Sequence, residues 1–404
     1  MKHFWKGSVY VFFALTYLAL SLEALNIFSV QKDLDSGKTG LEGNLAANEM
    51  AKSDESYAPA LRQTLSKRKI EIFVSLAVHT MHLLACIMFF ATSARNKSLK
   101  LMDKLFGNIF KLGLVFLTFM LSMLMIDMIF DYTVAFLGKN PPFGTVLLIC
   151  LCATVIVLPV FVFISTKLLR IFDITFIIAC YLSYFALEIL EVIFISDVNS
   201  AKMIKVAPEM FSESVQMVVS EQGLSESIYR ERIAGNDVNA ALIGIGSEER
   251  IEIYGSIQDI DKKELESIMM HEAGHSYYNS LAKKILVFFL LLITEMGILV
   301  FIFNKYTDKF VCENITKECS FVALACIYFV SVRPWIFILY NLTSQSTEIS
   351  ADILTKKYNY NDTLASVLYK ISIQSFEFLA PSPMYNLLNS LHPSTLSRIE
   401  YLSN

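Results

Sequence analysis

The chain lacks any excess of positive charge, since 34 lysine and arginine residues stand against 38 aspartate and glutamate residues, for a formal net charge of −4. Nucleic-acid binders carry a basic stripe on one face, so nucleic acid is not an expected partner. Cysteines are few and scattered, and most lie inside apolar stretches, where a thiol behaves as a small hydrophobic group. Neither a disulfide framework nor a zinc ribbon is indicated.

Cys312 and Cys319 differ from the other cysteines because they lie in a short polar segment. The same segment holds the triplet Asn314, Ile315 and Thr316, which has the pattern of a glycosylation site. On an oxidising side of a membrane these two thiols could form a disulfide. Two free thiols beside a chance triplet are the equally open alternative.

Apolar residues, by contrast, are abundant. They make up 54% of the 404 residues, with a mean hydropathy of +0.51, which exceeds what one soluble domain carries. Seven apolar runs are long enough to cross the roughly 30 Å hydrocarbon core of a bilayer as helices. They extend from Ser8 to Val30, Ile70 to Ala94, Phe106 to Leu137, Val146 to Leu168, Phe172 to Ile195, Ile285 to Phe303 and Ser320 to Leu342. The sequence thus predicts an all-α polytopic membrane protein with seven transmembrane helices.

The first apolar run follows Lys2 and Lys6, as a secretory signal peptide would. It is longer than the apolar core of such a peptide, and no clear small-residue cleavage site follows it. We therefore expect it to be retained as the first span.

The apolar runs divide the chain into four regions. These are residues 1–195 with five spans and a polar loop at 31–69, a polar block at 196–284, the sixth and seventh spans at 285–342, and a polar C-terminal segment at 343–404. In the polar block, amphipathic spacing predicts a helix from Met203 to Glu221. Asn239 to Gly246 and Arg250 to Tyr254 flank a turn and predict a β-hairpin. Because two spans separate the two polar regions, both face the same side of the membrane.

The pattern HEAGH occupies residues 271–275 of the polar block. The stretch Glu264 to Tyr278 has no proline and predicts a helix, on which His271 and His275 project from one face about one turn apart. Two imidazoles can then hold one metal ion, while Glu272 can take a proton from an attacking water and pass it to a leaving amine. This is the HExxH pattern of zinc metalloproteases, so the polar block is the expected catalytic domain. Two surface histidines on a helix are the alternative.

A catalytic zinc site needs three protein ligands, and Glu348 is the candidate for the third. Glu348 begins the pattern Glu-Ile-Ser-Ala-Asp, which on a helix places Asp352 one turn later on the same face. Asp352 could orient a ligand histidine through its second ring nitrogen. The alternative is a solvated acidic face beyond a membrane span.

A third pattern, HPSTLSRI, begins at His392 near the C-terminus. His392 and Arg398 could stabilise the oxyanion of a tetrahedral intermediate. Alternatively, Pro393 starts a last helix and Arg398 interacts with the end of its dipole.

Several predicted spans carry ionisable residues, which lipid does not tolerate unaided. They are Asp127, Asp131, Glu188, Glu191, Glu295 and Arg333. These side chains imply either an aqueous interior or paired charges between helices.

The three motifs, in this order and with two spans between the first two, resemble those of the type 1 CAAX prenyl proteases, membrane metalloproteases related to the bacterial HtpX proteases. That family typically has HExGH, then a Ser-Arg pair followed by ExxxD, then HPxxxxRI. Asn239 and Ala240 are similar to the family's Asn-Ala pair at the start of an edge strand that binds substrate by backbone pairing. Two positions depart from the pattern: Ser276 replaces the usual Trp, and Gln345 replaces the Arg before the third ligand.

The resemblance implies a barrel of seven transmembrane helices around a water-filled intramembrane chamber, with a small α+β metalloprotease domain of the HExxH gluzincin type. It implies one Zn²⁺ per chain on His271, His275 and Glu348, in the endoplasmic reticulum membrane with the active site facing the cytosol. The implied activity is removal of the last three residues of a farnesylated C-terminal Cys-a-a-X sequence, so the expected partners are a farnesylated substrate and membrane lipid.

Two other functions remain open. An HtpX-like quality-control protease shares the zinc chemistry, but those proteins usually have about four spans. A seven-span transporter or receptor would carry HEAGH by accident, which the three ordered motifs disfavour.

Overall fold

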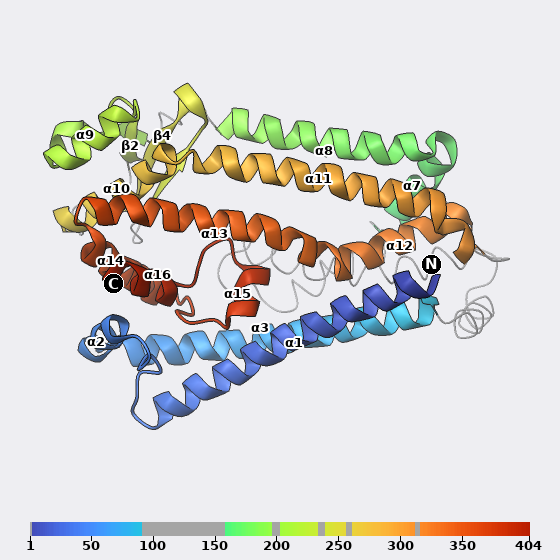
Figure 1. The fold of residues 1–404 in the computed structure, drawn as a ribbon, viewed down its shortest axis with the longest axis horizontal. Helices are drawn as coiled ribbons and strands as arrows, with labels where there is room; N and C mark the ends of the chain where they lie inside the picture. The colour runs from blue at the N-terminus through green and yellow to red at the C-terminus, as the bar shows by residue number, and fades with distance from the viewer. Residues whose placement is uncertain (1, 91–157, 196–202, 233–238, 256–260, 312–315) are drawn as a thin grey trace. The chain divides into compact units, whose positions relative to one another are not determined.

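The computed structural model of the chain describes residues 2–90, 158–195, 203–232, 239–255, 261–311 and 316–404, and these are mostly helical (Figure 1). The helices are α1 (Lys2–Asp35), α2 (Leu45–Ser53), α3 (Tyr57–Phe90), α7 (Leu158–Phe172), α8 (Ile174–Ile195), α9 (Glu213–Glu221), α10 (Lys262–Tyr277), α11 (Ser280–Lys305), α12 (Lys317–Ser331), α13 (Arg333–Lys357), α14 (Asn361–Gln374), α15 (Pro383–Asn389) and α16 (Thr395–Ser403). The strands are β1 (Met203–Lys205), β2 (Ile228–Glu231), β3 (Asn239–Ile243) and β4 (Arg250–Tyr254).

In the described part of the chain, two helices are long and apolar enough to cross a membrane, Gly7–Asp35 within α1 and α11. The bent pairs α7 with α8 and α12 with α13 raise this number to four if each pair is one span. On α11 the side chains of Leu286, Leu290 and Ile293 are more than half exposed, as on a helix that faces lipid.

Parts of the sequence prediction lie outside the described residues. They are the third span, most of the fourth, the end of the second, Asp127, Asp131 and Cys312. The predicted loop at 31–69 is largely helical, because α1 continues to Asp35, α2 begins at Leu45 and α3 begins at Tyr57.

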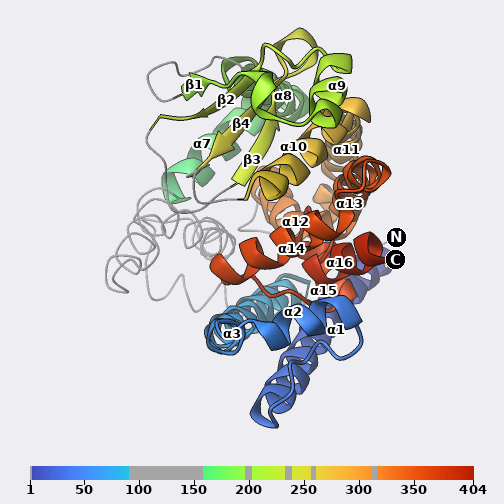
Figure 2. The same ribbon diagram turned by 90° about the vertical axis from the view of Figure 1, so that its left-hand side faces the viewer.

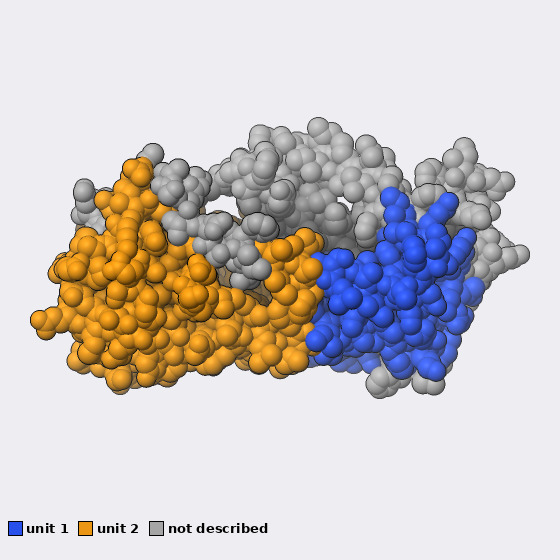
Figure 3. Space-filling view, turned by 90° about the horizontal axis from the view of Figure 1, so that it is seen from above, with its two compact units in different colours: residues 1–18, 74–184, 291–336 blue, residues 19–73, 185–290, 337–404 orange. Residues whose placement is uncertain are grey.

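The described chain divides into two compact units, coloured separately in Figure 3. The first unit comprises residues 1–18, 74–184 and 291–336, and its core joins the start of α1 to the end of α3, α7, α8, α11 and α12. Within it Glu295 is buried, and its Oε1 lies 2.9 Å from Nε of Arg333. These two predicted intramembrane charges are therefore paired, which lowers the cost of holding them in an apolar helix.

The second unit comprises residues 19–73, 185–290 and 337–404 and contains a four-stranded sheet in the order β1-β2-β4-β3 (Figure 2). The predicted hairpin is present, since β3 and β4 pair antiparallel with Ala240 opposite Ile253. Ile251 and Ile253 of β4 are fully buried in one core with Met269 and Met270 of α10. This packing fixes the edge strand β3 beside the HEAGH helix.

The helix predicted from Met203 to Glu221 is wrong for its first half. Met203–Lys205 forms β1, which pairs antiparallel with β2, and Pro208 starts a short 3₁₀ turn. Only Glu213–Glu221 is helical, as α9. A proline has no N–H for a helical hydrogen bond, and strand pairing satisfies the backbone before it.

The HEAGH helix is not continuous with the candidate membrane helix that follows it. α10 ends at Tyr277, Asn279 has a φ of 51°, and α11 starts at Ser280. A left-handed residue ends an α-helix, so the chain changes direction immediately after the motif. Glu348, in contrast, lies on α13, which runs unbroken from Arg333 through the predicted end of the last span.

Gly274, the glycine of HEAGH, lies where α10 meets α13. A Cβ atom at this position would stand 2.9 Å from Cα and 3.1 Å from the carbonyl oxygen of Ala351. The neighbouring atoms belong to the backbone and cannot rotate away, so only glycine allows this approach. The approach brings the histidines of α10 to Glu348 of α13.

We expect Gly274→Ala to push α10 away from α13 and to weaken zinc binding about tenfold or more, because misplaced ligands lose affinity steeply. Overpacking of this kind also costs about 1–3 kcal/mol of stability. Chelator competition and thermal unfolding in detergent measure the two effects.

Gly297→Ala in α11 is the matched control, since no heavy atom lies within 4 Å of a Cβ built there. It should leave zinc affinity unchanged and leave stability equal or slightly higher. Equal zinc affinity in the Gly274→Ala protein would show that the close approach does not define the site.

Candidate metalloprotease site

The HEAGH helix α10 positions the first three predicted site residues. Asp261 caps its N-terminus by accepting a hydrogen bond of 2.9 Å from the Lys263 N–H. His271 and His275 project one turn apart, with ring centroids separated by 4.8 Å. His271 and the neighbouring Glu272 are both buried.

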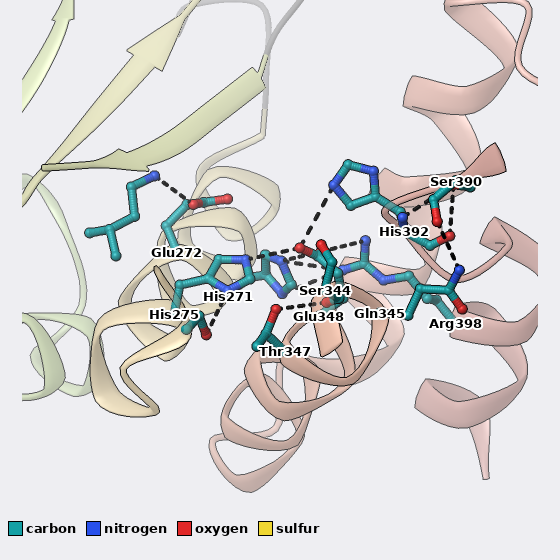
Figure 4. A network of polar contacts seen from close by, with 12 residues as sticks. His271, Glu272, His275, Ser344, Gln345, Thr347, Glu348, Ser390, His392 and Arg398 are labelled. Atoms are coloured by element: carbon teal, nitrogen blue, oxygen red, sulfur yellow. Dashed lines mark hydrogen bonds and ion pairs between the residues drawn. The ribbon is translucent and has the colours of Figure 1, made fainter. Parts of the chain in front are cut away.

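Glu348 of α13 reaches both histidines (Figure 4). Its Oε2 lies 3.4 Å from Nε2 of His271, and its Oε1 lies 3.5 Å from Nε2 of His275. One donor atom from each of these residues lies within 4.8 Å of the others, which in the described part of the chain is the group of three that could hold a metal ion. Two imidazoles and a carboxylate in a largely buried setting fit the ligand set of a catalytic zinc, with a fourth position free for a reactant.

Asp352 and Arg398 contact two of the candidate metal ligands, His271 and Glu348. Oδ1 of Asp352 lies 3.0 Å from Nδ1 of His271 and can fix the orientation of that ring. Arg398 of α16 donates from Nε and Nη2 to the two oxygens of Asp352, at 2.9 and 2.8 Å. Burial alone would raise the pKa of Asp352, but Arg398 and His271 together outweigh burial and lower that pKa. The carboxylate therefore stays charged beside the imidazole.

Glu272 lies against the edge strand of the sheet. Its Oε2 accepts a hydrogen bond of 2.8 Å from the N–H of Leu242 on β3. Burial raises the pKa of Glu272 to about 7. A carboxyl group with a pKa near neutrality can both take up and release a proton at physiological pH, as a general base and acid must.

His275 is held as a neutral ring. Burial lowers its pKa to about 3, so a lone pair is available for a metal at neutral pH. Its Nδ1 lies 3.2 Å from the hydroxyl of Ser280 at the start of α11. The site therefore adjoins the first turn of a candidate membrane helix.

Most of the predicted site residues line a single cavity of about 450 Å³. With the exception of Asp352, every predicted site residue lines it: Asn239, Ala240, His271, Glu272, His275, Glu348, His392 and Arg398. His392 is 62% exposed at its side chain, with Nε2 3.7 Å from Oε1 of Glu348. Segments that are far apart in the sequence thus meet at one opening.

The sequence did not identify the residues that hold the segment at 379–391, which contains α15 and precedes His392. Gln345, the departure from the family pattern, donates to the carbonyl of Ser390 at 2.9 Å. At the start of α15, the buried Glu23 of α1 accepts from the N–H of Ser382 at 2.6 Å, and its second oxygen lies 3.5 Å from Nε of Arg68. A carboxylate inside the first apolar run was the signal that could have identified Glu23.

Glu23→Gln should loosen the segment at 379–391, which contains α15, because a charged acceptor is replaced by a weaker neutral one. We expect amide hydrogen exchange in this segment to accelerate about tenfold, with zinc content unchanged. Exchange followed by mass spectrometry measures the effect.

Glu71→Gln is the matched control. Glu71 lies 3.0 Å from Nη1 of the same arginine, but its side chain is 38% exposed, so its loss should leave exchange near wild type. Equal exchange in both variants would contradict the role given to Glu23.

Comparison with known proteins gives a consistent result. Residues 211–404 match peptidase family M48. A CAAX prenyl protease 1 homolog of Dictyostelium discoideum is 23% identical over 171 residues, which cover 40% of this chain and 38% of that protein. The crystal structure of S. mikatae Ste24p aligns over 98% of both chains with a TM-score of 0.59 and 17% identity, which shows a shared fold.

The match to family M48 includes every residue that lines the cavity. The resemblance inferred from three short motifs is therefore confirmed by a sequence match over the catalytic region and by a fold shared along nearly the whole chain. Residues 211–404 are thus similar to peptidase family M48, and nearly the whole chain shares the fold of Ste24p, which supports the predicted likeness to the CAAX prenyl proteases.

Proposed function

We propose that this protein is an integral-membrane zinc endopeptidase that removes the last three residues of farnesylated proteins ending in Cys-a-a-X. The observation that carries the proposal is the convergence of a three-ligand group and Glu272 on one cavity beside an edge strand. The proposed location is the endoplasmic reticulum membrane, with the cavity on the cytosolic side.

The edge strand β3 offers a place for an extended substrate. β4 is its neighbour in the described sheet, and the Leu242 N–H points away from β4 to Glu272. A peptide laid along this edge can pair with the backbone of β3 and so bring one of its carbonyl groups to the ligand group. Asn239 and Ala240 lie at the start of the same strand and line the cavity.

The chemistry follows from the groups around that carbonyl. Zinc bound by His271, His275 and Glu348 would supply a Lewis acid that activates water and polarises the carbonyl. Glu272 takes the proton from the attacking water and then delivers it to the amine that leaves. His392, at the mouth of the cavity, can donate to the oxygen that becomes negative in the tetrahedral intermediate, while Arg398 fixes Asp352 and adds positive charge.

Cleavage of a farnesylated peptide by the wild-type protein and by Glu272→Gln tests this proposal. The variant should hold about one zinc per chain, as the wild type does, because Glu272 is not a ligand. Its turnover should fall by at least 10²- to 10⁴-fold, since general acid–base catalysis is lost. Metal analysis and peptide cleavage followed by mass spectrometry give the two readouts.

The same peptide without its lipid is the control for substrate class. Weak cleavage of the unmodified peptide supports a prenyl protease, whereas equal cleavage of both peptides favours an HtpX-like role. Wild-type turnover in the Glu272→Gln protein would overturn the mechanism.

A further inference from the structure

One cation in the catalytic cavity has no part in the chemistry described above. Lys284 lines the cavity together with His275 and Ser280, and its side chain is half-buried. Among the described residues, no carboxylate lies within ion-pair distance of its ammonium group, although Glu377 lines the same cavity. Lys284 is thus a positive charge that faces the substrate cavity without a partner in the described protein.

The position of Lys284 in its helix is unfavourable for a lysine. Lys283 and Lys284 lie in the first turns of α11, where the helix dipole is positive and disfavours cations. Lys283 points elsewhere, since its Nζ lies 5.9 Å from the ring centroid of Tyr278 and it does not line the cavity. An anion from outside the described chain would offset the cost at Lys284.

The substrate of the proposed function carries such an anion at a fixed distance. A Cys-a-a-X protein ends in a free α-carboxylate three residues beyond the bond to be cut, and three extended residues span about 10 Å. Ser280 lies 3.2 Å from the ligand His275, and Lys284 follows one helical turn later on the same face, about 5–6 Å further between Cβ atoms. The reach of a lysine side chain covers the remaining distance.

We propose that Lys284 binds the C-terminal carboxylate of the substrate and thereby sets the cleavage point three residues from the chain end. This inference rests on the proposed function. A lysine is suited to the task because its ammonium group donates up to three hydrogen bonds to a carboxylate as a mobile point charge. A charged contact inside a half-buried cavity also discriminates strongly against a neutral end group.

The test compares two farnesylated peptides that differ only at the C-terminus, one with a free carboxylate and one with an amide. The wild-type protein should prefer the free acid in kcat/KM by about tenfold or more, mainly through KM. Lys284→Met should raise KM for the free acid alone and bring the ratio between the two peptides close to one. Lys284→Arg should restore most of the preference, because the charge is kept.

Lys283→Met is the matched control, with the same charge change one residue away and outside the cavity, and it should keep the wild-type ratio. If Lys284→Met lowers cleavage of both peptides equally, or leaves cleavage of both unchanged, Lys284 does not bind the C-terminal carboxylate.

Binding measurements separate failure of this inference from failure of the proposed function. In the Glu272→Gln background, the dissociation constants of the two peptides report the carboxylate contact without any cleavage. A tenfold preference for the free acid that Lys284→Met removes supports the contact even if turnover is absent. Equal affinity for acid and amide overturns it even if the protein proves to be a protease.

Discussion

The contact between α10 and α13 at Gly274 and Ala351 determines the geometry of the whole site. Helices usually pack with their axes 8–10 Å apart, and small residues at the crossing allow the closest approach. Here the backbone of α13 occupies the space that any other side chain at position 274 would need. Because His271 and His275 come from one helix and Glu348 from the other, the distance between the helices sets the distance between the metal-binding atoms.

Close helix packing also concentrates charge, which the surrounding groups must balance. Glu348 and Asp352 bring two carboxylates into a buried space, and Arg398 contacts both, at 3.4 Å and 2.8 Å. Breaking such a buried network is costly, because the removal of one partner leaves the others desolvated and unpaired. A bound zinc ion would complete the balance. The helix α16, which carries Arg398, is therefore part of the candidate metal site even though it supplies no predicted ligand.

Local sequence patterns predicted the parts of this site that depend on one element. The spacing of His271 and His275 fixes their shared face, and the proline-free stretch around them predicts α10 to within two residues at its start. The alternating residues and the turn between them likewise predicted the β3–β4 hairpin. The family resemblance then connected motifs that no local rule could join.

What the sequence could not predict depends on contacts between distant segments. The bond from Glu23 to the N–H of Ser382 joins residues 359 positions apart, and no periodicity reports such a pair. Similarly, the spacing of Met203–Glu221 predicted a helix, but its first residues form β1. They pair with β2, which lies too far along the chain for the local pattern to report. The predicted end of the HEAGH helix at Tyr278 lies one residue from the observed end at Tyr277, but no periodic signal indicated the left-handed residue Asn279 before α11.

The central claim is that two histidines and one carboxylate, brought together by α10 and α13, form a zinc site. X-ray absorption spectroscopy of the purified protein loaded with one equivalent of zinc tests it directly. The account predicts a shell of nitrogen and oxygen ligands at about 2.0–2.1 Å, with the outer-shell scattering of two imidazoles. A sulfur shell near 2.3 Å, or scattering from a number of imidazoles other than two, would contradict it.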